Sequence, residues 1–271
     1  MLGLSLILIL LPLYDNLNYQ YQITKNCANQ PWVVQAWTGS EYKSYVIKPF
    51  GSESKCPTMS EVLGSVLAPK FDLPVPEPAL FKITNDFINT IPIPLRYPFL
   101  NIETDIVFGC ELIQGSYRFD PTMKKGQLSR MIDIDTSFAF DQLICNGDRT
   151  NYKPNILLLG DYAYIIDHEK GFNITNKSIR YVKNQNLATQ FAPYHIFHSY
   201  LANSITKTKR GYFIDFESQL RQIDFRFLDA YLGQLTELNV PIIEKKILYD
   251  YFSEIQTNSN DYLNLLRGTI L

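Results

Sequence analysis

Cysteine is scarce in this sequence, and the spacing of the few cysteines is uninformative. The 271 residues include four, Cys27, Cys56, Cys110 and Cys145, which lie far apart and form no C-x-x-C pair. Zinc sites and the disulfide frameworks of small secreted proteins require closer or regular spacing. The sequence therefore predicts reduced thiols rather than a zinc site or a disulfide scaffold.

An excess of positive charge is also missing. Lys and Arg together number 25 and Asp and Glu 27, which gives a net charge of −2 and a pI of about 6.0. Proteins that coat nucleic acids need a basic surface. No nucleic acid partner is therefore expected.

The only strongly apolar run, residues 1–13, lacks the features of a targeting segment. No Lys or Arg precedes Lys25, no small-residue cleavage site follows, and the run is too short to span a bilayer as a helix. We expect a buried first strand or helix in a cytoplasmic protein without stable membrane insertion. Secretion or peripheral membrane contact is the alternative.

Glycine is sparse where a phosphate-binding loop would need it. Two β-prone runs, residues 32–37 and 44–48, are separated by a turn with a single glycine, Gly39, and no G-x-G-x-x-G pattern occurs. The pattern predicts a hairpin with an ordinary turn.

The remaining patterns predict an α+β protein, and 46% hydrophobic residues suffice for a sizeable core. Residues 1–110 are predicted to form a small β-rich lobe and residues 111–271 a mainly helical lobe, with a ligand in the cleft between them. Helical spacing occurs in residues 59–70, 127–145, 188–204, 216–234, 242–255 and 262–266, and strands are expected at 79–83 and 107–113. Residues 84–98, with three prolines, are expected to form an extended connection.

The most informative stretch is residues 148–168. It places Asp148, Asn155 and Asp167 in that order around two apolar runs, which are predicted to pair as strands. Carboxylate and amide oxygens suit magnesium, and Asp148 in the preceding loop is placed to act as a base. Taken alone, Asp148 and Asn155 are better explained as residues that cap turns, but the order of the three residues matches kinase active sites.

Five segments together resemble the HipA-like kinase family, relatives of the HipA serine/threonine kinases and, more distantly, of phosphoinositide kinases. They span about residues 30–172: Tyr45-Val46-Ile47-Lys48-Pro49, Glu61 with Leu73-Pro74-Val75-Pro76-Glu77, Phe108-Gly109-Cys110-Glu111-Leu112-Ile113, the loop from Asp148 to Asn155, and Ile166-Asp167-His168. The resemblance implies a bilobal protein-kinase-like fold.

The resemblance also implies roles for individual residues. Lys48 would bind the ATP phosphates, Asp148 would be the base, and Asn155 with Asp167 would hold Mg²⁺. Glu61 is expected either to pair with Lys48 or to face solvent at a helix N-terminus. Further nucleotide contacts are expected from the hinge and from hydroxyls near Gly39: Glu111, Leu112, Ile113, Thr38, Ser40 and Ser44.

The loop departs from the kinase pattern in one respect. Kinases place the metal-binding Asn five residues after the base, where this chain has Lys153. Register with the apolar strand favours Asn155, with Asn151 in reserve, and leaves Lys153 as a γ-phosphate contact. The sequence leaves open whether Arg149 holds the loop or binds phosphate.

The function expected from these residues is an ATP-dependent kinase that phosphorylates a protein hydroxyl. A small-molecule kinase and a nucleotide-binding pseudokinase that acts as an interaction module are the alternatives. The resemblance also implies a cognate antitoxin-type partner.

Overall fold

The computed structural model describes residues 10–24, 31–48, 55–100, 104–184, 189–203 and 211–270. Most of the apolar segment 1–13 and residue Cys27 lie outside these ranges, whereas Cys56, Cys110 and Cys145 lie within them and are in no disulfide. Within the described ranges, no helix is both long and apolar enough to cross a membrane. The fold is α+β, as predicted from the sequence.

The chain divides into two compact units that are each discontinuous in sequence. The β-rich unit comprises Met1–Glu53, Glu77–Leu112 and Arg226–Ile242. The helical unit comprises Ser54–Pro76, Ile113–Phe225 and Ile243–Leu271.

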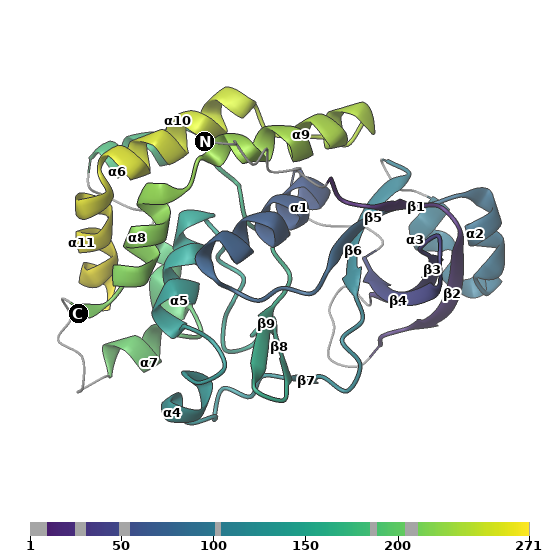
Figure 1. Cartoon of the computed structure of the whole chain (residues 1–271), viewed down its shortest axis with the longest axis horizontal. Helices are drawn as coiled ribbons and strands as arrows, with labels where there is room; N and C mark the ends of the chain where they lie inside the picture. Colours follow the sequence, from purple (N-terminus) through teal and green to yellow (C-terminus); the bar gives the residue numbers. More distant parts are fainter. Residues whose placement is uncertain are drawn as a thin grey trace, which may run out of the picture. The chain divides into compact units, whose positions relative to one another are not determined.

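A six-stranded curled sheet forms the β-rich unit (Figure 1). Its strands, in spatial order, are β1 (Leu13–Tyr14), β5 (Pro78–Lys82), β6 (Ile106–Glu111), β4 (Tyr42–Ile47), β3 (Trp32–Trp37) and β2 (Leu17–Gln22). All neighbours are antiparallel except β1 and β5. The predicted hairpin of β3 and β4 is therefore confirmed.

The connection over residues 84–98 is not extended, contrary to the sequence prediction. It contains α2 (Asn85–Thr90), η2 (Ile93–Leu95) and the start of α3 (Tyr97–Leu100). The Thr84 side chain caps α2 by accepting a hydrogen bond from the Phe87 amide. The three prolines lie outside α2, at the beginning of η2 or of α3, where the first turn of a helix tolerates proline. Phe99 packs edge-on against Trp32 at 4.6 Å between ring centroids, so these helices complete the core of the sheet.

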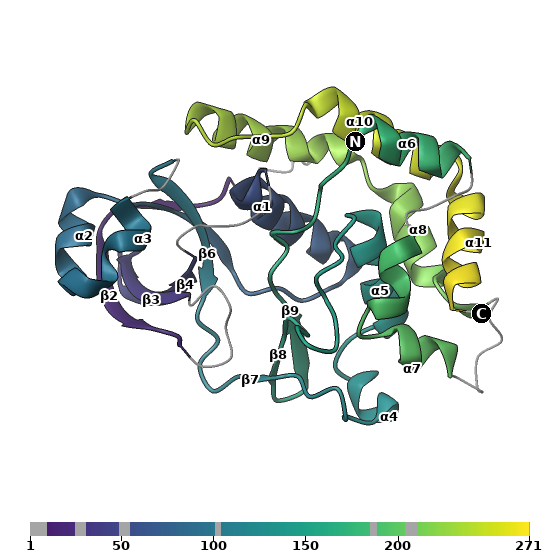
Figure 2. The same ribbon diagram turned by 180° about the vertical axis from the view of Figure 1, so that it is seen from behind.

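The helical unit is built around α5 (Ile134–Leu143), every residue of which is buried. Its other elements are α1 (Pro57–Leu67), η1 (Ala68–Phe71), α4 (Lys125–Leu128), α6 (Asn176–Lys183), η3 (Thr189–Tyr194), α7 (His198–Ala202), α8 (Ile214–Gln222), α10 (Lys245–Thr257) and α11 (Ser259–Thr269). Figure 2 shows α6 beside α10, with which it makes extensive contact. A three-stranded antiparallel sheet of β7 (Tyr117–Arg118), β8 (Ile156–Leu159) and β9 (Tyr162–Ile165) completes the unit.

Three predicted helices are shorter than the sequence pattern indicated. Residues 127–145 split into α4 and α5, because Asp133 caps a new helix and accepts hydrogen bonds from the Asp135 and Thr136 amides. Residues 216–234 split into α8 and α9 (Leu228–Glu237), joined by η5 (Phe225–Phe227). Within 188–204 only η3 and α7 occur among the described residues.

Candidate active site

The β8–β9 hairpin brings two predicted metal ligands together. Ile156 pairs with Ile165, and the Ile166 amide donates to the Asn155 carbonyl at 3.0 Å, so Asp167 directly follows the residue bonded to Asn155. Asn155 and Asp167 both have left-handed backbone conformations, with φ of 52° and 66°. Asn and Asp adopt this region more readily than other non-glycine residues. The hairpin therefore ends on each side in a sharp bend.

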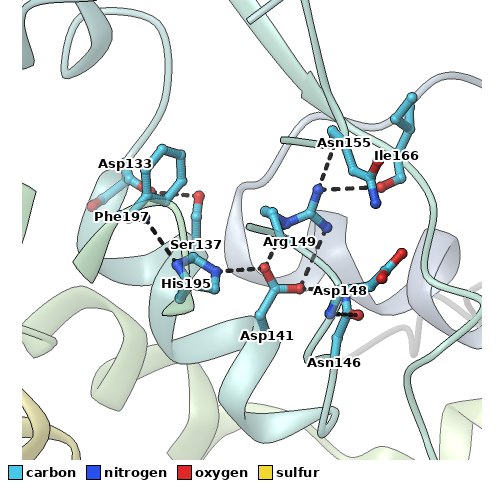
Figure 3. Close-up of polar contacts among 10 residues, drawn as sticks. All are labelled: Asp133, Ser137, Asp141, Asn146, Asp148, Arg149, Asn155, Ile166, His195 and Phe197. Atoms are coloured by element: carbon cyan, nitrogen blue, oxygen red, sulfur yellow. Dashed lines mark hydrogen bonds and ion pairs between the residues drawn. The ribbon is translucent and has the colours of Figure 1, made fainter. Parts of the chain in front are cut away.

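Arg149, from the loop between Asn146 and Asn155, contacts both bends (Figure 3). Its side chain is 0% exposed. The guanidinium Nη1 donates to the Asn155 carbonyl at 2.5 Å and to the Ile166 carbonyl at 3.2 Å. The structure therefore places Arg149 as a residue that holds the loop, one of the two roles that the sequence left open.

The Asp141 carboxylate, from α5, forms a buried ion pair with the Arg149 guanidinium. Its Oδ2 accepts from Arg149 Nε at 2.5 Å and from His195 Nε2 at 2.9 Å. Its Oδ1 accepts from Asn146 Nδ2 at 2.9 Å and from Arg149 Nη2 at 3.3 Å. Burial by itself would raise the pKa of Asp141, but Arg149 and His195 hold it well below its usual range. Asp141 is therefore a fully bonded buried anion.

His195 reaches Asp141 from the segment that follows η3. Its Nδ1 accepts from the Phe197 amide at 3.1 Å, so Nε2 carries the proton that is donated to Asp141. Burial lowers the pKa of His195, although Asp141 opposes this shift. The Ile196 amide also donates to the Arg149 carbonyl at 3.0 Å. This segment is thus bonded to Asp141 through a side chain and to the loop at Arg149 through the backbone.

Asp148, the predicted base, lies in the same loop. Its amide donates to Asn146 Oδ1 at 3.2 Å, and its side chain is 19% exposed. Lys153 Nζ lies 3.3 and 3.4 Å from the two Asp148 carboxylate oxygens. The backbone of Asp148 is thus fixed while its carboxylate is accessible and next to a cation.

Asp167 belongs to a cluster of three carboxylates. Oxygen atoms of Glu61, from α1, and of Asp167 and Glu169 all lie within 4.8 Å of one another. Glu61 Oε2 also accepts from the His168 amide at 2.8 Å. Among the described residues, Asn155 Nδ2 is buried without a hydrogen-bond partner. The clustered carboxylate oxygens are the hard ligands that a magnesium ion prefers, whereas Asn155 Nδ2 is a hydrogen-bond donor and not a metal ligand.

His168 is buried against neighbouring helices. Its ring lies against Gly64 of α1, where an added Cβ would come within 2.4 Å of His168 Cγ. It also contacts Phe140 edge-on, at 6.0 Å between ring centroids. The ring therefore packs between α1 and α5, and the supporting role expected from the sequence stays a prediction.

The β-rich unit carries the other predicted nucleotide contacts. Lys48 directly follows β4 and lies on the strand face opposite the core residues Tyr45 and Ile47. Ser40 lies in the exposed β3–β4 turn, where its hydroxyl is 3.4 Å from that of Thr38.

The predicted hinge residues lie at the end of the same sheet. The amides of Glu111 and Leu112 donate to the carbonyls of Glu77 and Ser44, both at 2.9 Å. Ile113 is the first residue of the next segment of the helical unit.

Sequence reasoning missed four residues of this site: Asp141, Asn146, His195 and Glu169. Asp141 offered a signal, because it is a charged residue inside the apolar run of a helix and such residues are rarely buried without partners. His195 offered none, since its partner Asp141 is 54 residues away.

Comparisons with known proteins identify the family of this chain. The family model described as HipA-like kinase matches residues 21–223. A search of curated proteins gave no match. One solved structure, the crystal structure of a Helicobacter pylori proinflammatory kinase, CtkA, is 11% identical with a TM-score of 0.43 and covers 96% of this chain and 98% of that one. We draw no conclusion from this structural likeness. Because the family model matches most of the sequence, the chain belongs to the HipA-like kinase family.

Proposed function

We propose that this protein is an ATP-dependent phosphotransferase that transfers the γ-phosphate of ATP to a serine or threonine hydroxyl of a protein. The observation that carries the proposal is the loop geometry: the backbone of a partly exposed Asp148 is bonded to Asn146, and the adjacent Arg149 is bonded to the two bends at Asn155 and Asp167. This arrangement suits phosphoryl transfer, in which catalysis depends on positioning and charge stabilisation.

In the proposed reaction, Asp148 orients the acceptor hydroxyl and accepts its proton. The hydroxyl oxygen bonds to the γ-phosphorus while the bond to the β–γ bridging oxygen breaks, and ADP leaves. Lys153, next to Asp148, contacts the γ-phosphate. Magnesium, when bound, supplies charge neutralisation at the phosphate oxygens, and Asn155 and Asp167 would hold it.

The nucleotide contacts assigned to the other residues belong to the same proposal. Lys48 binds phosphates, Glu61 orients Lys48, and Ser40 with Thr38 contacts phosphate from the β3–β4 turn. The backbone of Glu111, Leu112 and Ile113 holds the adenine. The lobes at residues 1–110 and 111–271, a cytoplasmic location and an antitoxin-type partner stay predictions.

A nucleotide-binding pseudokinase is the second candidate. Two observations favour it: the β3–β4 turn has a single glycine, Gly39, and the fifth position after Asp148 holds Lys153 instead of Asn. Turnover separates the two candidates, since a pseudokinase binds ATP without transferring phosphate.

The variant Asp148→Asn tests the proposal. We expect it to leave ATP affinity within about threefold of wild type but to lower transfer by at least about 100-fold, because general bases contribute on the order of 10² to 10⁴ in rate. Calorimetry would measure affinity, and radiolabel transfer to a protein substrate would measure rate.

The matched control is Asp161→Asn, which changes an exposed aspartate in the β8–β9 turn and should have little effect. If Asp148→Asn transfers phosphate at the wild-type rate, the assignment of the base is wrong. A wild-type protein that binds ATP without any transfer would favour the pseudokinase.

A further inference from the structure

The Asp141 carboxylate is connected to Asp148, Asn155 and Ile166 through one intermediate residue each. Arg149 connects it to the carbonyls of Asn155 and Ile166. Asn146 donates to Asp141 and accepts from the Asp148 amide, which connects it to the proposed base. Figure 3 shows these bonds converging on one side chain.

We propose that Asp141 is a positioning residue that acts through Arg149 and Asn146 to hold the base and the metal-binding bends in one arrangement. This inference rests on the proposed function, because it assigns a purpose to residues that touch neither nucleotide nor acceptor.

The chemistry of arginine explains why the connection is rigid. A guanidinium presents its five N–H donors in a fixed plane. When one edge of the Arg149 guanidinium is bonded to Asp141, the directions in which Nη1 can donate to backbone carbonyls are therefore fixed as well. Those carbonyls belong to Asn155, whose backbone is left-handed, and to Ile166, which precedes the left-handed Asp167. The position of Asp141 therefore limits how the two bends can lie relative to each other.

General stabilisation explains the network less well. A buried ion pair gives little net stability compared with apolar residues of the same size, because both charges lose their hydration. The bonds are instead directed at the backbone beside the proposed catalytic side chains. Residues that orient metal ligands in this indirect way typically change metal affinity or activity 10- to 100-fold when they are mutated.

Two variants of the full-length protein separate positioning from stability. Arg149→Lys keeps the charge but loses the planar fork, so we expect Mn²⁺ to bind at least about tenfold more weakly in the presence of a non-hydrolysable ATP analogue, with transfer also reduced. Asn146→Ala removes the hydrogen bond to Asp141 together with the one from the Asp148 amide, and leaves the bonds of Arg149 in place. It should reduce transfer about tenfold and leave Mn²⁺ affinity within twofold of wild type.

The matched control is Gln256→Met. Gln256 Nε2 donates to the carbonyls of Leu220 and Ile223, both at 2.8 Å, so it also joins two backbone carbonyls but has no bond to the catalytic loop. Its loss should change melting temperature and leave both Mn²⁺ affinity and transfer within twofold. Asp167→Ala serves as the reference for a lost ligand. Electron paramagnetic resonance of free Mn²⁺ gives the affinities, and circular dichroism reports folding.

The outcomes distinguish the inference from the function on which it rests. If Arg149→Lys is folded and binds Mn²⁺ like wild type, the inference is overturned while the proposed function stands. If Arg149→Lys does not fold, Asn146→Ala decides: reduced transfer with intact Mn²⁺ binding supports the inference, and unchanged transfer overturns it. If the wild-type protein shows no nucleotide-dependent Mn²⁺ binding, the proposed function fails and the inference fails with it.

Discussion

Two loops of this protein were both predicted to approach ATP phosphates, yet they are held in opposite ways. The loop from Asn146 to Asn155 is anchored by a fully buried arginine and a buried aspartate. The β3–β4 turn is exposed, and the side-chain hydrogen bonds of Thr38 in it stay within the turn, to Ser40 and Glu41. The first loop takes its geometry from the folded core, whereas the second takes it from four consecutive residues.

This difference implies different tolerance to change. A buried charged group needs its partners, because an unpaired charge in the interior is strongly unfavourable. An exposed hydroxyl exchanges a protein partner for water at little cost. Mutations should therefore damage the first loop far more than the second.

The largest effect should follow from Arg149→Met. Removing one partner of a buried ion pair leaves Asp141 uncompensated, and we expect the free energy of unfolding to fall by about 3–5 kcal/mol in urea titrations. Arg221→Met is the control, because Arg221 pairs with Glu217 on the surface of α8 at 2.6 Å and should cost no more than about 1 kcal/mol. Equal losses in the two variants would contradict the comparison.

A smaller effect should come from acid. Burial lowers the pKa of His195 from its ordinary 6.5. As the pH drops through 6.5, the histidine is protonated in the unfolded chain but not in the native state, so the free energy of unfolding falls. The lowered pKa of Asp141 adds a further loss below about pH 4, where the unfolded carboxylate is protonated first.

Unfolding free energies at pH 7.5 and 5.5 would measure the histidine effect. In His195→Gln the decrease over this interval should be smaller than in wild type, because one of the three histidines no longer titrates. The same pH dependence in both proteins would show that His195 is not the group responsible.

The smallest effect should follow from Thr38→Val. The Thr38 hydroxyl donates to the Glu41 carbonyl at 2.9 Å and accepts from the Glu41 amide at 3.3 Å, but both bonds are exposed. We expect the free energy of unfolding to fall by less than about 1 kcal/mol in urea. A loss above about 2 kcal/mol would mean that the turn is held by more than its own four residues.

The same contrast explains which features the sequence could predict. The β3–β4 hairpin and the order of Asp148, Asn155 and Asp167 are encoded in short local patterns, so they are visible without a structure. The fold class followed from those patterns. The roles of the site residues stay predictions.

Features that depend on distant partners were not predictable. Nothing near His195 in the sequence indicates that it bonds to Asp141, and the helices at residues 85–100 were hidden by three nearby prolines. In the second case a local signal was present, since Thr84 is a favourable N-cap residue, but the prolines outweighed it. A hydrogen bond between residues distant in the sequence and a conflict between local signals thus explain why these two features were not predicted.

The return of α9 to the β-rich unit has a consequence for synthesis on the ribosome. Gln234 of α9 donates to the Leu11 carbonyl at 2.7 Å and accepts from the Leu11 amide at 3.2 Å. The β-rich unit uses residues up to Leu112 and then none until Arg226. At about 5–20 residues per second, translation takes roughly 6–23 s to cross that gap. The nascent sheet must therefore wait for this helix while most of the helical unit emerges, so it cannot complete its contacts until late in synthesis.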